Sequence, residues 1–236
     1  MAKILITGAT SKIGRKLSVE FAKKGFDLAL HYNKSQDIAN ELKRKLEAFS
    51  IDTILLRADV TKSYEVEVVF DEIEKKIGKV DILINNLGVF PEKIDFKNIR
   101  EEQWDRIFAI NLKSIFLFSQ LFAKQNIVSG KIINIASVGG MEHWKGSLLY
   151  NVTKSALIHL TKSLAIELAP EVTVNCVSPG IIQSEDSRIV IPETKIPMKK
   201  YGCAQDIFNA IMYFIENDYV TGQNLIIDGG YNLKRR

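Results

Sequence analysis

The chain has only two cysteines, Cys176 and Cys203, among its 236 residues. Two thiols are too few for a disulfide framework, and these two lack the short spacing of a zinc site. His143 and His159 have no carboxylate or second ligand at a spacing typical of metal coordination, so we expect no metal site. We predict that both thiols are buried and that the protein resides in a reducing compartment.

A strong charge of one sign is also absent. The formal net charge is +4, and basic residues are scattered among acidic ones instead of forming a stripe. This pattern disfavours nucleic acid as a partner. We interpret the one basic run, residues 234–236, as a solvated terminus.

We expect neither a targeting signal nor a linker. After Lys3 the chain enters a short aliphatic run, without the charged region, apolar stretch and cleavage site of a signal peptide. We find no apolar segment long enough to span a bilayer and expect a cytoplasmic protein with no membrane partner. There is no internal repeat, low-complexity tract or Pro/Gly/Ser-rich linker, so we predict one domain over residues 1–236.

Short aliphatic runs recur along the chain without polar alternation, which is typical of strands covered on both faces of a parallel sheet. They are Ile4–Ile6, Leu28–Leu30, Thr53–Leu56, Ile82–Ile84, Ile132–Ile135, Thr173–Val177 and Leu225–Ile227. Helical patterns lie between them, at Ile13–Lys24, Ser35–Ala48, Tyr64–Ile77, Glu101–Gln125 and Ser147–Leu168. The alternation predicts an α/β fold: a single doubly wound Rossmann-type domain with a parallel sheet of about seven strands.

The two longest predicted helices, Glu101–Gln125 and Ser147–Leu168, contain more apolar residues than one face can hold. Such helices are buried on more than one side, either in the core or against another subunit. We favour subunit contact, which predicts a homo-oligomer, a dimer or tetramer. A further segment, about Ile181–Lys200, fits neither a strand nor a helix, and we interpret it as a substrate loop or a plain surface excursion.

A glycine-containing turn, Thr7–Gly14, follows the first predicted strand and precedes the first helix. In this position glycine lets backbone N–H groups approach a pyrophosphate, which the helix N-terminus stabilises. The turn therefore predicts a dinucleotide site. Its candidate ligands are Gly8, Ser11, Lys12, Ile13 and Gly14.

The second predicted strand runs on into Asn33, Lys34 and Ser35, where an NAD-selective site would usually place a carboxylate for the ribose hydroxyl. No carboxylate is present there. Lys34, with Asn33 and Ser35 as hydrogen-bond donors, can instead hold a 2′-phosphate. We therefore predict NADP(H) in preference to NAD(H).

Tyr150 and Lys154 are four residues apart in a predicted helix and so share one face, and Ser137 lies upstream after a predicted strand. A free phenol titrates near pH 10, and a neighbouring ammonium would favour the phenolate. Tyr150 can then donate a proton to a carbonyl oxygen while Ser137 hydrogen-bonds that oxygen and a nicotinamide supplies hydride. Lys154 can also bind the nicotinamide ribose. This arrangement predicts carbonyl reduction to an alcohol.

Taken in order, these motifs resemble the short-chain dehydrogenase/reductase family over essentially the full length of the chain. The matching pieces are Thr7–Gly14, Asp59-Val60, Asn85-Asn86-Leu87-Gly88, Asn111, Ser137, Tyr150/Lys154 and Pro179-Gly180. The resemblance implies a catalytic tetrad of Asn111, Ser137, Tyr150 and Lys154, in which Asn111 holds a water that links Lys154 to solvent. It also implies roles for residues around the cofactor: Asp59 and Val60 beside the adenine, Asn85 and Gly88 at the central strand and cofactor, and Pro179, Gly180 and Ile182 at the nicotinamide.

The chain departs from this pattern at two positions, with Lys12 in place of a glycine and Leu87 in place of an alanine. Lys12 and the pair His31-Tyr32 are similar to the pteridine reductase branch, which uses NADPH, whereas Ser137 is typical of carbonyl reductases. The leading substrate implied by the resemblance is a 3-oxoacyl thioester on acyl carrier protein. A pterin, a sugar or small alcohol with NAD, and a non-catalytic nucleotide-binding regulator remain alternatives.

Overall fold

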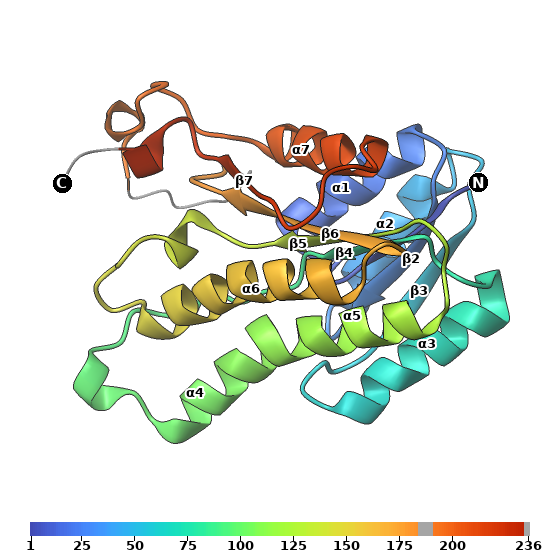
Figure 1. The fold of residues 1–236 in the computed structure, drawn as a ribbon, viewed down its shortest axis with the longest axis horizontal. Helices are drawn as coiled ribbons and strands as arrows, with labels where there is room; N and C mark the ends of the chain where they lie inside the picture. The colour runs from blue at the N-terminus through green and yellow to red at the C-terminus, as the bar shows by residue number, and fades with distance from the viewer. Residues whose placement is uncertain (184–190, 234–236) are drawn as a thin grey trace.

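Seven parallel strands form one sheet in the order β3-β2-β1-β4-β5-β6-β7 (Figure 1). The computed structural model describes residues 1–183 and 191–233. Its strands are β1 Lys3–Ile6, β2 Asp27–Tyr32, β3 Thr53–Arg57, β4 Ile82–Asn85, β5 Gly130–Ile135, β6 Val172–Pro179 and β7 Asn224–Ile227. Each contains or overlaps a predicted run, and the predicted doubly wound parallel fold is confirmed.

Helices cover both faces of the sheet (Figure 1). One layer holds α1 Lys12–Lys23, α2 Gln36–Leu46 and α7 Ala204–Glu216; the other holds α3 Ser63–Ile77, α4 Glu101–Phe108, α5 Ser114–Lys124 and α6 Leu148–Glu167. Because successive strand residues point to opposite faces, Ile4 and Ile6 belong to the core under α1 whereas Leu5 belongs to the core under α3 and α5. Both faces of each central strand are therefore apolar.

Helix α7 is absent from the predicted elements. The large apolar residues that it buries, Ile207, Phe208, Ile211 and Phe214, are spaced as one helical face. That spacing is the signal that identifies the helix. At its N-cap lies Cys203, which is exposed, so the expectation of two buried thiols is correct only for Cys176.

The helix predicted over residues 101–125 is interrupted by a π-helical turn, Ala109–Lys113. Asn111 lies at the centre of this turn, and its side chain is fully buried. A π turn inside an α-helix is often found at functional sites because it changes the direction of the side chains that follow. Here it places a predicted site residue.

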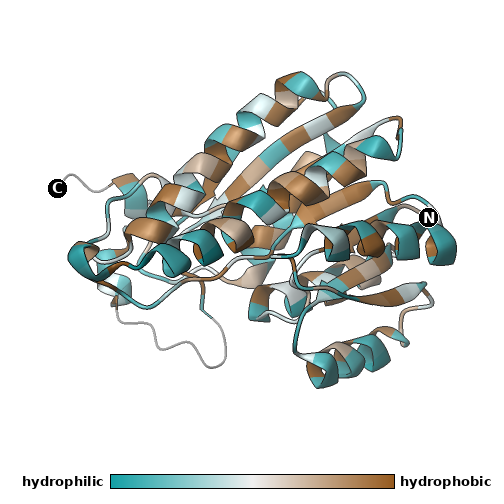
Figure 2. Cartoon of the chain, turned by 90° about the horizontal axis from the view of Figure 1, so that it is seen from below, coloured by the Kyte–Doolittle hydropathy of each residue, from teal (hydrophilic) through white to brown (hydrophobic). Residues whose placement is uncertain are grey.

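The continuous helix Glu101–Lys124 is 24 residues long and, by length and composition, apolar enough to cross a membrane. The expectation that no such segment exists is therefore wrong. The helix nevertheless contributes to the core, since Ile115, Phe118 and Phe122 are almost completely buried. Figure 2 shows the molecule from the side of the layer formed by α3, α4, α5 and α6, and apolar residues appear in brown along the helices of this layer.

The chain order along the sheet reverses between β1 and β4, the neighbouring strands at its centre. In doubly wound folds the carboxyl ends of the strands at such a reversal border a crevice where ligands bind. The turn after β1 and the Asn85–Gly88 segment after β4 both lie at this edge. The topology therefore brings two predicted motifs together.

Candidate active site

The turn after β1 is shaped by two glycines. Gly8 has φ +63°, a left-handed conformation that favours glycine, and a Cβ on Gly14 would lie 2.5 Å from the Gly8 carbonyl oxygen. Ser11 caps helix α1 by accepting a hydrogen bond from the Gly14 N–H (3.0 Å). A close turn at a capped helix N-terminus is the cradle that a pyrophosphate requires. The turn thus fits the predicted dinucleotide.

Asn86 holds this turn to β4. Its side-chain amide donates to the carbonyl oxygens of Thr7 (2.9 Å) and Gly8 (3.0 Å) and to the Ser11 hydroxyl (3.2 Å). The neighbouring Asn85 is buried and donates to Asn134 Oδ1 (2.9 Å), so its side chain supports the sheet rather than the cofactor surface. From the sequence, Asn86 is recognised only as part of a motif, and these contacts give it a role.

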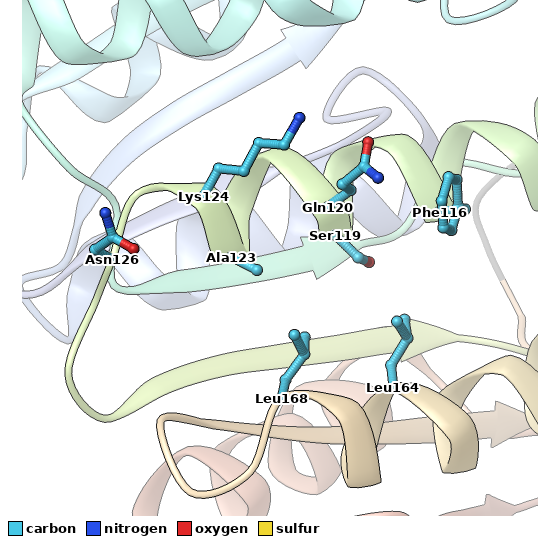
Figure 3. Close-up of a pocket in the computed structure, with 8 residues that line it drawn as sticks. All are labelled: Phe116, Ser119, Gln120, Ala123, Lys124, Asn126, Leu164 and Leu168. Carbon is cyan, nitrogen blue, oxygen red and sulfur yellow. The ribbon is translucent and has the colours of Figure 1, made fainter.

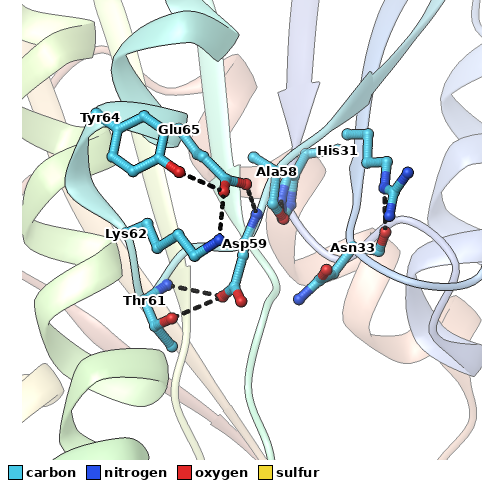
Figure 4. A network of polar contacts seen from close by, with 9 residues as sticks. His31, Asn33, Ala58, Asp59, Thr61, Lys62, Tyr64 and Glu65 are labelled. Carbon is cyan, nitrogen blue, oxygen red and sulfur yellow. Dashed lines mark hydrogen bonds and ion pairs between the residues drawn. The ribbon is translucent and has the colours of Figure 1, made fainter.

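His31 connects the same turn to the end of β3. Its Nδ1 accepts from the Gly8 N–H (3.2 Å), so Nε2 carries the proton and donates to the Ala58 carbonyl (3.1 Å; Figure 4). Burial lowers the pKa of His31 to about 4. The imidazole is therefore neutral at pH 7, and it acts as a fixed bridge between the phosphate turn and the strand that precedes Asp59.

Asp59 begins a polar network after β3 (Figure 4). Its carboxylate accepts from the Thr61 hydroxyl (2.8 Å) and backbone N–H (3.1 Å), and these bonds lower its pKa. The Asp59 N–H donates to Glu65, which also pairs with Lys62 (2.9 Å). These bonds fix the backbone at Asp59 and the buried Val60, the two residues expected beside the adenine.

The four residues of the predicted tetrad come together from three parts of the fold. Tyr150 and Lys154 lie on α6, Ser137 follows β5, and Asn111 lies in the π turn. Lys154 Nζ is 5.9 Å from the centre of the Tyr150 ring, and Ser137 hydrogen-bonds the phenol. A Cβ on Gly88 would lie 3.2 Å from Lys154 Nζ and 3.8 Å from Asn111 Oδ1. Glycine at position 88 therefore leaves room for the lysine and asparagine side chains that lie next to it.

The protonation of this cluster differs from the expectation. Burial raises the pKa of Tyr150, and the hydrogen bond from Ser137 opposes the shift only in part. Lys154 Nζ donates to the Ile135 carbonyl (2.7 Å), and burial lowers its pKa to about 8. The expected lowering of the Tyr150 pKa by Lys154 is thus wrong for this structure: the causes of the shift are burial and the Ser137 hydrogen bond, and the charge of Lys154 is not among them. The phenol is protonated at neutral pH and available as a proton donor.

The Asn111 side chain forms three hydrogen bonds. Oδ1 accepts from the Val89 N–H (2.8 Å), and Nδ2 donates to the Val89 carbonyl (2.9 Å) and the Thr153 hydroxyl (3.3 Å). Asn111 therefore joins the segment after β4 to α6, beside Lys154. Its role in a water relay stays a prediction.

Aromatic rings surround the Tyr150 phenol. The Phe90 ring meets Tyr150 edge to face at 4.6 Å between ring centres, and the Trp144 ring lies almost parallel to Tyr150 at 6.4 Å. A Cβ on Gly139 would lie 2.9 Å from atoms of both Trp144 and Tyr150, so glycine is required there. Phe90 is 55% exposed and forms a wall beside the reactive group.

Residues near the end of β6 form the remaining part of the predicted site. The Gly180 N–H donates to the Ile227 carbonyl (2.9 Å), and a Cβ at Gly180 would lie 2.6 Å from Asp228 Cβ. Ile182 forms an isolated bridge with Gly202. The predicted substrate loop, about 181–200, lies partly outside the described residues, at 184–190.

A phosphate turn at the reversal of a parallel sheet, with a tyrosine, a lysine and a serine gathered near the same edge, is the arrangement of a nicotinamide-dependent oxidoreductase. The family described as enoyl-(acyl carrier protein) reductase matches residues 8–232. The chain belongs to the short-chain dehydrogenase/reductase family, as the resemblance predicts. This membership supports an enzyme that acts on CH–OH and C=O groups.

Relatives of this chain include both NADP- and NAD-linked proteins. It is 33% identical to a 3-oxoacyl-[acyl-carrier-protein] reductase of Staphylococcus epidermidis, over 96% of this chain and 97% of the relative. It is also 33% identical to an NAD-dependent glycerol dehydrogenase of Listeria innocua, over 98% and 93% of the two chains. A short-chain dehydrogenase from Burkholderia cenocepacia in complex with NADP has the same fold, with a TM-score of 0.92, 28% identity and 98% of each chain covered.

Proposed function

We propose that the protein is an NADPH-dependent reductase of 3-oxoacyl thioesters. The observation that carries the proposal is the meeting of Ser137, Tyr150 and Lys154 in one cluster, where burial raises the pKa of the phenol. The bound nicotinamide supplies hydride to the carbonyl carbon. Tyr150 donates its proton to the carbonyl oxygen, Ser137 orients that oxygen by a hydrogen bond, and the Lys154 ammonium stabilises the phenolate that is left.

The preference for NADPH rests on the end of β2. Asn33, Lys34 and Ser35 follow this strand, and none of them is a carboxylate that would repel a 2′-phosphate. The similarity to the Burkholderia protein with bound NADP supports the preference, whereas the Listeria relative shows that the family also includes NAD-dependent members.

A pterin is the second candidate substrate, because Phe90 and Trp144 line the position of the phenol with aromatic surface. Flat conjugated rings stack on such walls. The flexible chain of an acyl thioester can contact the same apolar surface, but it does not stack on the rings as a flat conjugated ligand does.

The test is a substrate panel with both nicotinamides. We expect acetoacetyl-CoA, as a 3-oxoacyl thioester, to be reduced with the largest kcat/KM, and to be reduced faster with NADPH than with NADH. Quinonoid dihydropterin and the oxidation of glycerol with NAD⁺ are the competing reactions. Faster turnover of either, or NADPH binding without any turnover, would reject the proposed substrate.

We also propose that the protein forms a homo-oligomer through the helices 101–125 and 147–168. A groove of about 880 Å³ lies between α4–α5 and α6 and is lined in part by Phe108, Leu112 and Leu160. A second groove of about 440 Å³ adjoins it at Phe116, and Figure 3 shows Leu164 and Leu168 facing α5 across this groove. Neither groove is lined by a tetrad residue. Apolar surface continuous over two helices fits a second copy of the same helices, packed about a twofold axis.

Replacing Phe116 with glutamate should dissociate the oligomer. The ring is 42% exposed and touches both grooves, so a carboxylate there would be desolvated at the interface. Size-exclusion chromatography with light scattering should give a dimer or tetramer for the wild type and a monomer for the variant. Val128→Glu is the control, because Val128 is 89% exposed and lines neither groove. A monomeric wild type would reject the proposal.

A further inference from the structure

We infer that Arg57 is a ligand of the cofactor's 2′-phosphate and determines the choice between NADPH and NADH. This inference rests on the NADPH preference proposed above and assigns it to a side chain outside the β2–α2 turn. Arg57 ends β3, and its Cα is the register partner of Tyr32, the last residue of β2. The parallel register therefore places Arg57 beside the turn Asn33–Ser35.

One contact fixes the guanidinium over this turn. Arg57 Nε donates to the Asn33 carbonyl oxygen (3.2 Å), the bond drawn to Asn33 in Figure 4. The bond uses the inner nitrogen and leaves the terminal nitrogens as donors for another group. Because a guanidinium presents its donors in a planar fork, it matches two oxygens of a phosphate at once.

The charge of Arg57 is not neutralised by the carboxylates of the neighbouring network. Asp59 accepts from Thr61, and Glu65 accepts from the Asp59 N–H and Lys62. No carboxylate lies within ion-pair distance of Arg57 in residues 1–183 and 191–233. Arg57 is exposed, so an anion reaches it from solvent.

The turn itself provides a second donor. Ser35 is the N-cap residue of α2, yet its side chain makes no capping hydrogen bond. The Tyr32 hydroxyl, at the end of β2, donates to the side chain of Gln36, the first residue of α2. This bond joins the two ends of the turn. A phosphate on the ribose would thus be bound by the guanidinium of Arg57, which comes from β3. On the other side it would be bound by Lys34 and Ser35, which precede α2. NADH has only a hydroxyl at this place and gains little from the guanidinium.

The experiment is a fluorescence titration of NADPH and NADH into the wild type, Arg57→Gln and Arg44→Gln. Arg44 is an exposed arginine in the last turn of α2, so its variant controls for the loss of one surface charge. We expect Arg57→Gln to weaken NADPH by about 10- to 100-fold, the effect of losing a charged hydrogen-bonding partner, and NADH by less than about twofold. Arg44→Gln should leave both dissociation constants unchanged.

Different failures are distinguishable. Equal weakening of both cofactors would show that Arg57 only supports the turn, and unchanged dissociation constants for both would show that the phosphate binds elsewhere; either result overturns the inference. Lys34→Gln, measured in parallel, identifies the lysine as the determinant if it alone removes the preference. A wild type that binds NADH as tightly as NADPH would reject the proposed cofactor preference and this inference together.

Discussion

Replacing Tyr150 with phenylalanine should reduce the kcat/KM for carbonyl reduction by about 10² to 10⁴-fold, the usual contribution of a positioned general acid. The phenol is the proton donor in the proposed reaction, and burial keeps it protonated. Phenylalanine retains the ring contact with Phe90 but has no proton to give. The dissociation constant of NADPH, measured by fluorescence, should stay within about threefold of wild type.

Tyr213→Phe is the matched control, since Tyr213 is an exposed tyrosine on α7 and its variant makes the same chemical change away from the cluster. It should leave the rate unchanged. A Tyr150→Phe protein that keeps half of the wild-type rate would show that the proton comes from another donor.

Much of the fold follows from the sequence because buried parallel strands have a simple signature. Strands such as β1 and β4 are apolar on both faces, so each reads as an unbroken aliphatic run. The meeting of Ser137 with Tyr150 and Lys154 is also predictable, since the helical spacing and the resemblance specify it. The π turn at Asn111 is not, because no residue type signals a single wide turn within an apolar helix.

Other parts of the site depend on contacts between distant segments. His31 reads as a strand residue, and only the register of β2 with β1 and β3 shows that its two nitrogens join Gly8 to Ala58. The protonation of Tyr150 also depends on the folded structure. A neighbouring ammonium is expected to lower the pKa of Tyr150, but the size of the opposing desolvation depends on burial, which spacing in the sequence does not specify.

Replacing Lys154 with methionine should remove most of the reductase activity, by at least about 10²-fold in kcat/KM. The methionine has similar length but no ammonium to stabilise the phenolate. In the wild type, the pKa of Lys154 is about 8, so the charged form that this step needs is lost above that pH. The wild-type kcat/KM for reduction should therefore fall about tenfold per pH unit above pH 8, as measured in the free-enzyme profile.

The same variant should change how stability depends on pH. The pKa of Lys154 falls from 10.5, the value of a solvated lysine, to about 8 in the folded chain, so between these values the unfolded chain binds more protons than the folded chain. The cost of burying the ammonium, on the order of 3 kcal/mol, is present below pH 8 and disappears as the pH rises towards 10.5. Urea unfolding should show the wild type gaining this stability relative to Lys154→Met between about pH 7 and pH 10, while groups common to both proteins cancel in the difference. Parallel stability curves for the two proteins would mean that the ammonium is solvated, and the role given to burial in setting the chemistry of the cluster would be wrong.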